Sequence, residues 1–123
     1  MKFVKSNLEP IKIELNGEQY PIKLTFGALS QIEESTGLSF IALFDVMTSQ
    51  KQTSKIIAEM LYSMLIAGGV EVEKRDIAEL EFTNEQHKSI NKGIAAALLR
   101  HVKFTSDIEA DTNEEENQDD KKK

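Results

Sequence analysis

The dipeptide Asn16-Gly17 is the feature that most limits the folds open to this chain. It follows the run 11–15, in which apolar and polar residues alternate, and a second alternating run comes directly after it. Asn-Gly favours a two-residue type I′ turn, because both central residues of that turn need positive φ. Such a turn fixes the strand register, so the sequence predicts a hairpin in which Ile13 lies opposite Tyr20.

The remaining positions of the hairpin agree with this register. It pairs Ile11 with Ile22 on the same apolar face, and it pairs Lys12 with Pro21 on the other face. Pro21 then occupies a non-hydrogen-bonded position, where its missing N–H points away from the partner strand. The outer edge of the second strand is thereby protected against further pairing.

The next segment predicts two helices. Thr25 is a suitable N-cap for a helix from Phe26 to about Ser35, which Gly37 ends, and Ser39 is a suitable N-cap for a short second helix. The side chains expected to point inward are Phe26, Leu29 and Ile32 in the first helix, and Phe40, Ile41, Phe44 and Met47 in the second.

The strongest helical pattern begins at Thr53 or Ser54 and ends at Gly68-Gly69. A capping box at 83–86 predicts a last helix from Asn84 to about Lys103. The side chains expected to point inward are Ile56, Ile57, Met60, Leu61, Met64 and Leu65 in the former, and Ile90, Ile94, Ala97, Leu98 and Val102 in the latter, with Leu99 as a further candidate.

The segment between these helices fits two structures. Residues 70–73 alternate as a short strand does, whereas 75–80 fit a helix. With either outcome, the chain is predicted to be mainly α with an N-terminal β-hairpin, an α+β fold of four to five helices.

The composition changes abruptly at Phe104. From Thr105 onward the chain has eight acidic residues and one large apolar residue, Ile108. Such a segment cannot bury enough apolar surface to offset a backbone entropy cost of about 1–2 kcal/mol per residue. We therefore expect residues 1–104 to form one domain of hairpin and helices, and 105–123 to be a disordered acidic tail.

The distribution of charge limits the partners. The tail accounts for most of the net charge of −6, and the preceding body holds 13 acidic and 12 basic residues. A nearly neutral body does not favour binding to nucleic acid through its phosphates. The longest apolar run, 64–67, is far shorter than a membrane span of about 20 residues, and 1–10 do not resemble a signal peptide. We expect an intracellular protein without a nucleic-acid or membrane partner.

No residue pattern points to catalysis. The chain has no cysteine, and His87 and His101 lie about 21 Å apart if they share one helix, so they cannot hold one metal ion. Nucleophile elbows, zinc-binding helices and phosphate-binding loops are missing from the sequence. We predict no catalytic, cofactor or metal site, and a protein that is not an enzyme.

Apolar and methionine side chains are the candidates for partner binding. Phe40, Phe44 and Met47 lie on a short helix whose complete burial is not assured, and Met60 and Met64 lie in the strongest helical stripe. Flexible methionines and exposed rings suit an adaptable docking surface. Ordinary core packing is the alternative, and it is the commoner role for such stripes.

The order of these elements resembles a known family. A hairpin over 11–24 is followed by Thr25-Phe26-Gly27-Ala28-Leu29, by 32–37, by a Met/Leu-rich helix ending at Gly68-Gly69, and by a closing helix and an acidic tail. Over roughly 11–102 this order is similar to that of the tail assembly chaperones of long-tailed phages and prophages, particularly those of Gram-positive hosts.

The resemblance implies specific partners. Proteins of that family bind the long tape measure protein, keep it soluble and help to recruit tail tube subunits; self-association is a further expectation. They act in the host cytoplasm and are absent from the mature virion. Many are made in two lengths by a −1 ribosomal frameshift. Because a run of A encodes consecutive lysines, Lys121-Lys122-Lys123 fits the short product of such a gene.

A small DNA-binding regulator is the alternative from a different class. Residues 54–69 followed by 75–80 have the spacing of a helix-turn-helix. In and around its second helix the acidic residues outnumber the two cations, Lys74 and Arg75, whereas a recognition helix normally presents a basic or neutral polar face.

Overall fold

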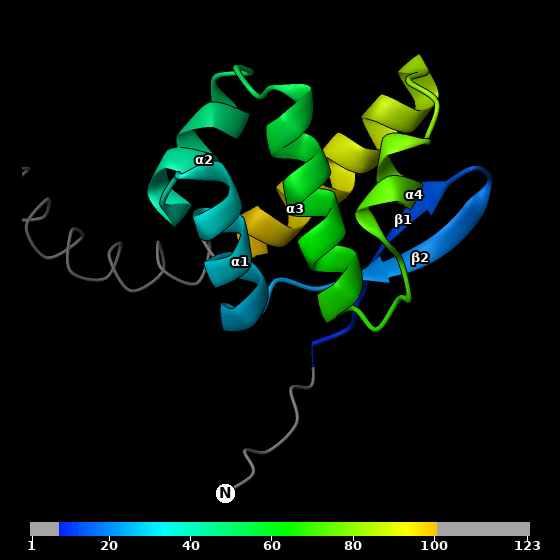
Figure 1. Ribbon diagram of the computed structural model, residues 1–123, viewed down its shortest axis with the longest axis horizontal. Coiled ribbons are helices and arrows are strands. Elements are labelled where there is room, and N and C mark those ends of the chain that lie inside the picture. Colours follow the sequence, from blue (N-terminus) through cyan, green and yellow to red (C-terminus); the bar gives the residue numbers. More distant parts are fainter. Residues whose placement is uncertain (1–7, 101–123) are drawn as a thin grey trace, which may run out of the picture.

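The computed structural model describes residues 8–100, which form an N-terminal two-stranded antiparallel hairpin followed by five helices. The elements are β1 (Ile11–Leu15), β2 (Glu18–Ile22), α1 (Phe26–Thr36), α2 (Phe40–Thr48), α3 (Ser54–Ala67), α4 (Lys74–Ala78) and a closing helix over 84–100. Figure 1 shows α3 at the centre, with α1 and α2 on one side of it and α4 and the hairpin on the other. The predicted α+β fold class is confirmed, while the predicted tail, 105–123, lies outside the described residues.

The hairpin has the predicted register and turn. Ile13 pairs with Tyr20 and Ile11 with Ile22, and both central residues of the turn have positive φ. These φ angles are 52° at Asn16 and 84° at Gly17, as a type I′ turn requires.

Four helices begin where the sequence predicts, each with a Ser or Thr hydroxyl that accepts a hydrogen bond from a first-turn N–H. The capping pairs are Thr25 with Ala28 (3.1 Å), Ser39 with Ala42 (3.2 Å), Thr53 with Ile56 (3.3 Å) and Thr83 with Gln86 (3.1 Å). Each cap satisfies an N–H that has no partner inside its own helix.

The core lies between the hairpin, α3 and the closing helix. α3 contributes Met60, Leu61, Met64 and Leu65, and the closing helix contributes Ile90, Ile94, Ala97 and Leu98. All eight were predicted to point inward. The apolar face of the hairpin packs on the same cluster, with Ile13 and Ile22 each 1% exposed.

Three predicted core positions are wrong. Phe26 is 90% exposed, Ile41 is 76% exposed and Leu99 is 53% exposed. A helix turns by about 100° per residue, which places each of them well away from the buried stripe of its helix. The stripe of α2 is centred near Leu43, which is 0% exposed and was missing from the prediction. Val102 lies outside the described residues.

The ambiguous segment 70–82 contains a helix and no strand. α4 occupies Lys74–Ala78, and residues 70–73 lead into it without strand pairing. The Asp76 carboxylate accepts a hydrogen bond of 2.9 Å from the backbone N–H of Glu73, which holds the first turn of this short helix.

Two glycines allow helices to approach the hairpin closely, Gly93 against a side chain and Gly68 against the backbone. A Cβ on Gly93 of the closing helix would lie 1.9 Å from Cγ2 of Ile13, and a Cβ on Gly68 would lie 2.4 Å from the carbonyl oxygen of Pro21. Gly68 was predicted only to terminate α3.

Side chains of the closing helix cover the outer edge of β1. Ser89 Oγ accepts a hydrogen bond from the Glu14 N–H (2.9 Å) and donates one to the Glu14 carbonyl (2.7 Å). Gln86 Oε1 accepts from the Asn16 N–H (3.2 Å), and Gln86 Nε2 donates to Asn16 Oδ1 (3.0 Å). The predicted capping box is therefore only half formed, because the Gln86 side chain turns to the hairpin instead of to Thr83.

Candidate partner-binding surface

The five candidate residues lie in two different environments. Met60 and Met64 lie on α3 in the centre of the core, and each is 0% exposed. No partner reaches them in this conformation, so their role here is packing. Phe40, Phe44 and Met47 lie on α2, are half-buried, and pack against the core from its outer side.

The apolar residues of α2 continue from the core to the surface. Around the helix, half-buried Phe44 lies between buried Leu43 and exposed Ile41. We call the band formed by Phe40, Ile41, Phe44 and Met47 the α2 surface. Asp45 is the one charged residue in this helix, so the α2 surface is unusually apolar for a helix at the outside of a small domain.

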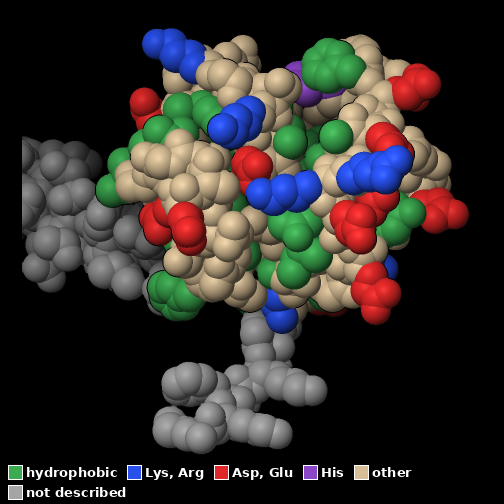
Figure 2. Space-filling model, viewed as in Figure 1, with side chains coloured by type: hydrophobic (Ala, Val, Ile, Leu, Met, Phe, Trp, Pro, Cys, Tyr) green, Lys and Arg blue, Asp and Glu red, His purple; other side chains and the backbone are tan. Residues whose placement is uncertain are grey.

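A second apolar region lies between α3, α4 and the beginning of the closing helix. It is a groove of about 410 Å³, with Ile57, Leu61, Leu80 and Ile90 among its lining residues. Phe82 lies at its rim and is 81% exposed. We call this region the Phe82 groove. Figure 2 shows an exposed apolar ring beside a histidine at the corresponding corner of the molecule.

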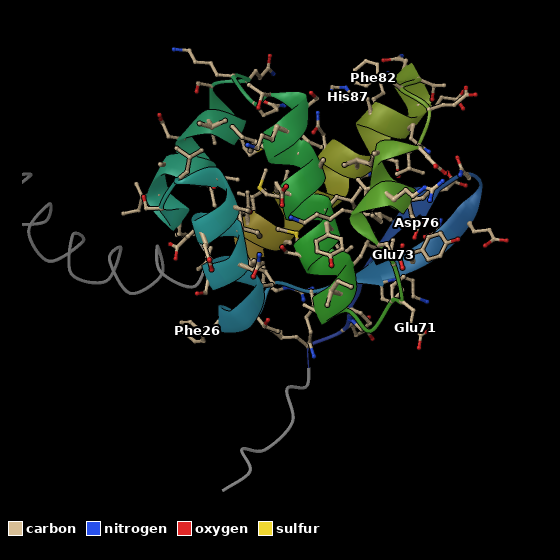
Figure 3. The ribbon with its side chains drawn as sticks, in the orientation of Figure 1. Phe26, Glu71, Glu73, Asp76, Phe82 and His87 are labelled. Carbon is tan, nitrogen blue, oxygen red and sulfur yellow. The ribbon has the colours of Figure 1, made fainter. Side chains whose placement is uncertain are left out.

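The Phe82 ring is held by the helix that follows it. Its centroid lies 5.2 Å from that of His87, and Figure 3 shows the two side chains next to each other. Phe82 precedes the N-cap Thr83, and His87 occupies the fourth helical position, which is the spacing of a hydrophobic staple. On its other side, His87 Nε2 lies 3.0 Å from Asn91 Nδ2.

The sequence reasoning missed Phe82 as a surface residue. The signal was present, since an aromatic residue directly before a capping Thr is the outer member of a staple. Because a staple orders a side chain without burying it, this pattern separates Phe82 from the core-forming residues around it.

An acidic groove adjoins the Phe82 groove. Its lining includes four carboxylates, those of Glu14, Glu79, Glu81 and Glu85, and no Lys or Arg. It has a volume of about 470 Å³, and it shares Glu81 and Gln86 with the Phe82 groove. Apolar and acidic surfaces therefore meet along the loop that leads into the closing helix.

The cations of α4 are held by neighbouring side chains. Lys74 Nζ lies 3.3 Å from a carboxylate oxygen of Glu59 and 5.6 Å from the centre of the Tyr62 ring. Arg75 Nε lies 3.1 Å from a carboxylate oxygen of Glu79. These pairs tie α4 to α3 and to its own last turn. Lys55 of α3 lines the Phe82 groove but not the acidic groove.

Half-buried Tyr20, on the apolar face of the hairpin near its turn, has a shifted pKa. The Tyr20 hydroxyl donates a 3.0 Å hydrogen bond to the Glu18 carboxylate. This bond, together with the negative charge of Glu18, raises the pKa of Tyr20 above its usual value of 10.0.

Within residues 8–100, no three His, Asp or Glu side chains gather closely enough to hold a metal ion. None of the helices in that range has the length and hydropathy needed to cross a membrane. His101, the second histidine of the sequence, lies outside the described residues.

Comparison with known families identifies the chain as a phage tail-related protein. Residues 10–104 match the family described as "Phage tail tube protein, GTA-gp10", and since the match spans most of the sequence, the chain belongs to that family. Searches of curated proteins and of solved structures found no match.

Proposed function

We propose that this protein is a phage tail assembly chaperone that binds the tape measure protein, keeps it soluble and helps to recruit tail tube subunits. It acts in the host cytoplasm as a binding protein without catalytic activity, and it is absent from the mature virion. One observation carries the proposal: a member of a phage tail family exposes apolar side chains, while Glu14 on one sheet edge is already bonded and Pro21 on the other has no N–H.

The two occupied or blocked edge positions favour an assembly factor over a subunit that builds a tube wall by strand addition. The backbone of Glu14 on the outer edge of β1 is occupied by Ser89, and β2 contains Pro21, which has no N–H to offer. At the end of β2, the Lys23 N–H donates to the Met64 carbonyl of α3 (3.0 Å). Added strands would have few backbone groups to pair with.

The α2 surface supports binding to an apolar partner. Burial of apolar area contributes about 25 cal/mol per Å², so exposed Ile41 and half-exposed Phe44 are natural anchors for a hydrophobic contact. Met47 adds an unbranched side chain that adapts to different partner shapes. The prediction of Phe40, Phe44 and Met47 as partner-binding residues belongs to this proposal.

Co-expression with the tape measure protein of the same phage tests the proposal. The soluble fraction of the tape measure protein should rise several-fold with this chain, and Ile41→Ser should reduce the gain. Ile66→Ser is the matched control, because Ile66 is an apolar residue on α3 that is 45% exposed. The Ile66→Ser variant should give the same gain in solubility as the wild type. Mass spectrometry of purified virions is the second arm. Finding this chain there at the level of the tube subunit would refute the proposal.

The resemblance also implies that this chain is the short product of a frameshifting gene, and we include that in the proposal. Re-pairing of tRNA after a one-base slip needs repeated bases, which consecutive lysine codons supply at 121–123. The gene sequence should show an uninterrupted A-rich heptamer there and an open −1 frame. Mixed AAG codons would remove this part and leave the chaperone proposal standing.

The helix-turn-helix alternative gains no support from α4. This helix has five residues, and both of its cations pair with carboxylates, Lys74 with Glu59 and Arg75 with Glu79. A recognition helix needs cations and polar groups directed at the DNA grooves and phosphates. A mobility-shift assay that showed tight, salt-sensitive binding to duplex DNA would favour the regulator instead.

A further inference from the structure

We infer that the Phe82 groove and the adjoining acidic groove form one docking site for a basic amphipathic helical segment of the partner. The apolar side chains of that segment fill the Phe82 groove, and its Lys or Arg side chains face the acidic groove. The inference rests on the proposed function in taking the tape measure protein as the source of the segment. It names a surface on the opposite side of α3 from the α2 surface (Figure 1).

The apolar half of the site is built to receive side chains. Ile57 and Leu61 come from α3, Leu80 from the loop after α4, and Ile90 from the closing helix. Phe82 stands at the rim with 81% of its surface exposed. Large exposed rings beside an apolar groove are the usual anchors of helix-in-groove recognition.

The site is ordered before a partner arrives. Phe82 is fixed by its staple with His87, Thr83 caps the closing helix, and Gln86 of the same first turn bonds to Asn16 of the hairpin. The loop that separates the two grooves is therefore tied where it enters the closing helix. Preorganised contacts lose less entropy on binding than mobile ones, which favours this loop as a recognition element.

The charge of the adjoining groove identifies the partner. Glu14, Glu79, Glu81 and Glu85 line it without a Lys or Arg, and Arg75 compensates Glu79 alone. Opposite charges on the partner steer association and fix its register. Since apolar and acidic surfaces lie side by side, the partner must present apolar and basic groups on adjacent faces. A helix does so through its 3.6-residue period.

The same charges disfavour a second copy of this chain as the occupant. A symmetric dimer through this face would bring the carboxylates of one copy towards those of the other. Like charges facing each other across an interface are unfavourable. Self-association through the Phe82 groove is therefore an outcome that the test must exclude.

The test uses the full chain and two synthetic helical probes with the same leucine spacing, one carrying lysines and the other glutamates. The Leu/Lys peptide should bind, as measured by fluorescence anisotropy, and the Leu/Glu peptide should bind at least tenfold more weakly. Phe82→Ser should weaken Leu/Lys binding about tenfold, which corresponds to about 1.4 kcal/mol. Phe26→Ser is the matched control, because Phe26 is 90% exposed and lies at the opposite corner of the molecule (Figure 3).

The acidic half has its own variants. Glu81→Lys combined with Glu85→Lys should weaken binding of the Leu/Lys peptide several-fold and flatten its salt dependence. Glu34→Lys, at an exposed position of α1, should do neither. Equal binding of both peptides, or equal loss in the Phe26 and Phe82 variants, would overturn the inference. Dimerisation of the wild type that Phe82→Ser abolishes would also overturn it, in favour of self-association.

Co-purification separates this inference from the proposed function. If the tape measure protein co-purifies with the wild type and with Phe26→Ser but is lost with Phe82→Ser, both stand. If it co-purifies equally with all three, the docking site is wrong and the chaperone proposal stands. If it never co-purifies although the Leu/Lys peptide binds through Phe82, the proposed partner is wrong and the docking site stands.

Discussion

The hairpin and α2 are attached to the core by different means. Directional contacts fix the hairpin: Ser89 and Gln86 of the closing helix bond to its backbone, and Gly93 lets Ile13 lie directly against that helix. α2 has such a contact to another helix, from the Phe40 N–H to the Glu33 carboxylate of α1 (3.2 Å), and one fully buried side chain, Leu43, while its other large apolar residues remain half-buried or exposed.

This difference separates a rigid part from an adaptable one. Hydrogen bonds and close backbone contacts specify one geometry, whereas apolar contact is not directional and tolerates small shifts. α2 therefore has room to adjust to a partner, and the hairpin with the first turn of the closing helix is a fixed platform. Amide hydrogen exchange should be slower in β1 than in α2, because a segment with more local contacts opens less often.

The largest expected effect comes from removing the single anchor of α2. Leu43→Ala should lower the free energy of unfolding by about 3 kcal/mol, since it removes a completely buried leucine and leaves a cavity. Amide exchange should rise most in α2 and least in the hairpin. Ile41→Ala on the same helix is the control and should change stability little. A uniform rise across both regions would show that α2 is not a separate unit.

The next largest effect comes from the close approach at the hairpin. Gly93→Ala should cost about 2 kcal/mol by urea unfolding, because its Cβ would collide with the branched side chain of Ile13. Gly27→Ala is the matched control. It lies in α1, where the new Cβ would be 3.8 Å from the Thr25 hydroxyl oxygen, and it should stabilise the fold by up to about 1 kcal/mol. If Gly93→Ala were as harmless as Gly27→Ala, the hairpin would be less rigid than we propose.

A smaller effect isolates the hydrogen bonds at the strand edge. Ser89→Ala removes both contacts to the Glu14 backbone and should cost about 1 kcal/mol, because those groups return partly to water. Hydrogen exchange at the Glu14 amide should accelerate. Ser30→Ala, at an exposed position of α1, should leave that amide unchanged. Unaltered protection of the Glu14 amide in the Ser89 variant would show that Ser89 does not hold the edge of β1.

The two regions also differed in how well the sequence predicted them. Asn16-Gly17 carries its structural requirement in two residues, so the turn, the register and the pairing of Ile13 with Tyr20 all followed from local rules. The helix starts were predictable for the same reason, since a cap hydroxyl acts within one turn.

Properties that depend on distant neighbours were not predictable. In α2 nearly every residue is apolar, so periodicity alone did not show that Leu43 faces inward and Ile41 outward. Gln86 fits a capping box, yet it bonds to a turn that lies far away in the sequence. The exposed ring of Phe82 was missed because its groove is assembled from three separate helical regions.

The smallest expected effect comes from Tyr20, a half-buried residue of β2 that packs against the core beside the turn of the hairpin. The Glu18 carboxylate raises the pKa of Tyr20, so the neutral phenol is favoured in the folded state. A group whose pKa is raised on folding adds stability below its unfolded pKa and loses it as pH rises through the folded value. Stability should therefore decline slightly only above about pH 10. In a Tyr62→Phe background, phenolate absorbance should show Tyr20 titrating above 10.0, and Glu18→Gln should lower that midpoint. An unchanged midpoint would mean that the Tyr20–Glu18 contact does not persist in solution, and the rigidity of the hairpin would then come entirely from its apolar packing and from its hydrogen bonds to the closing helix.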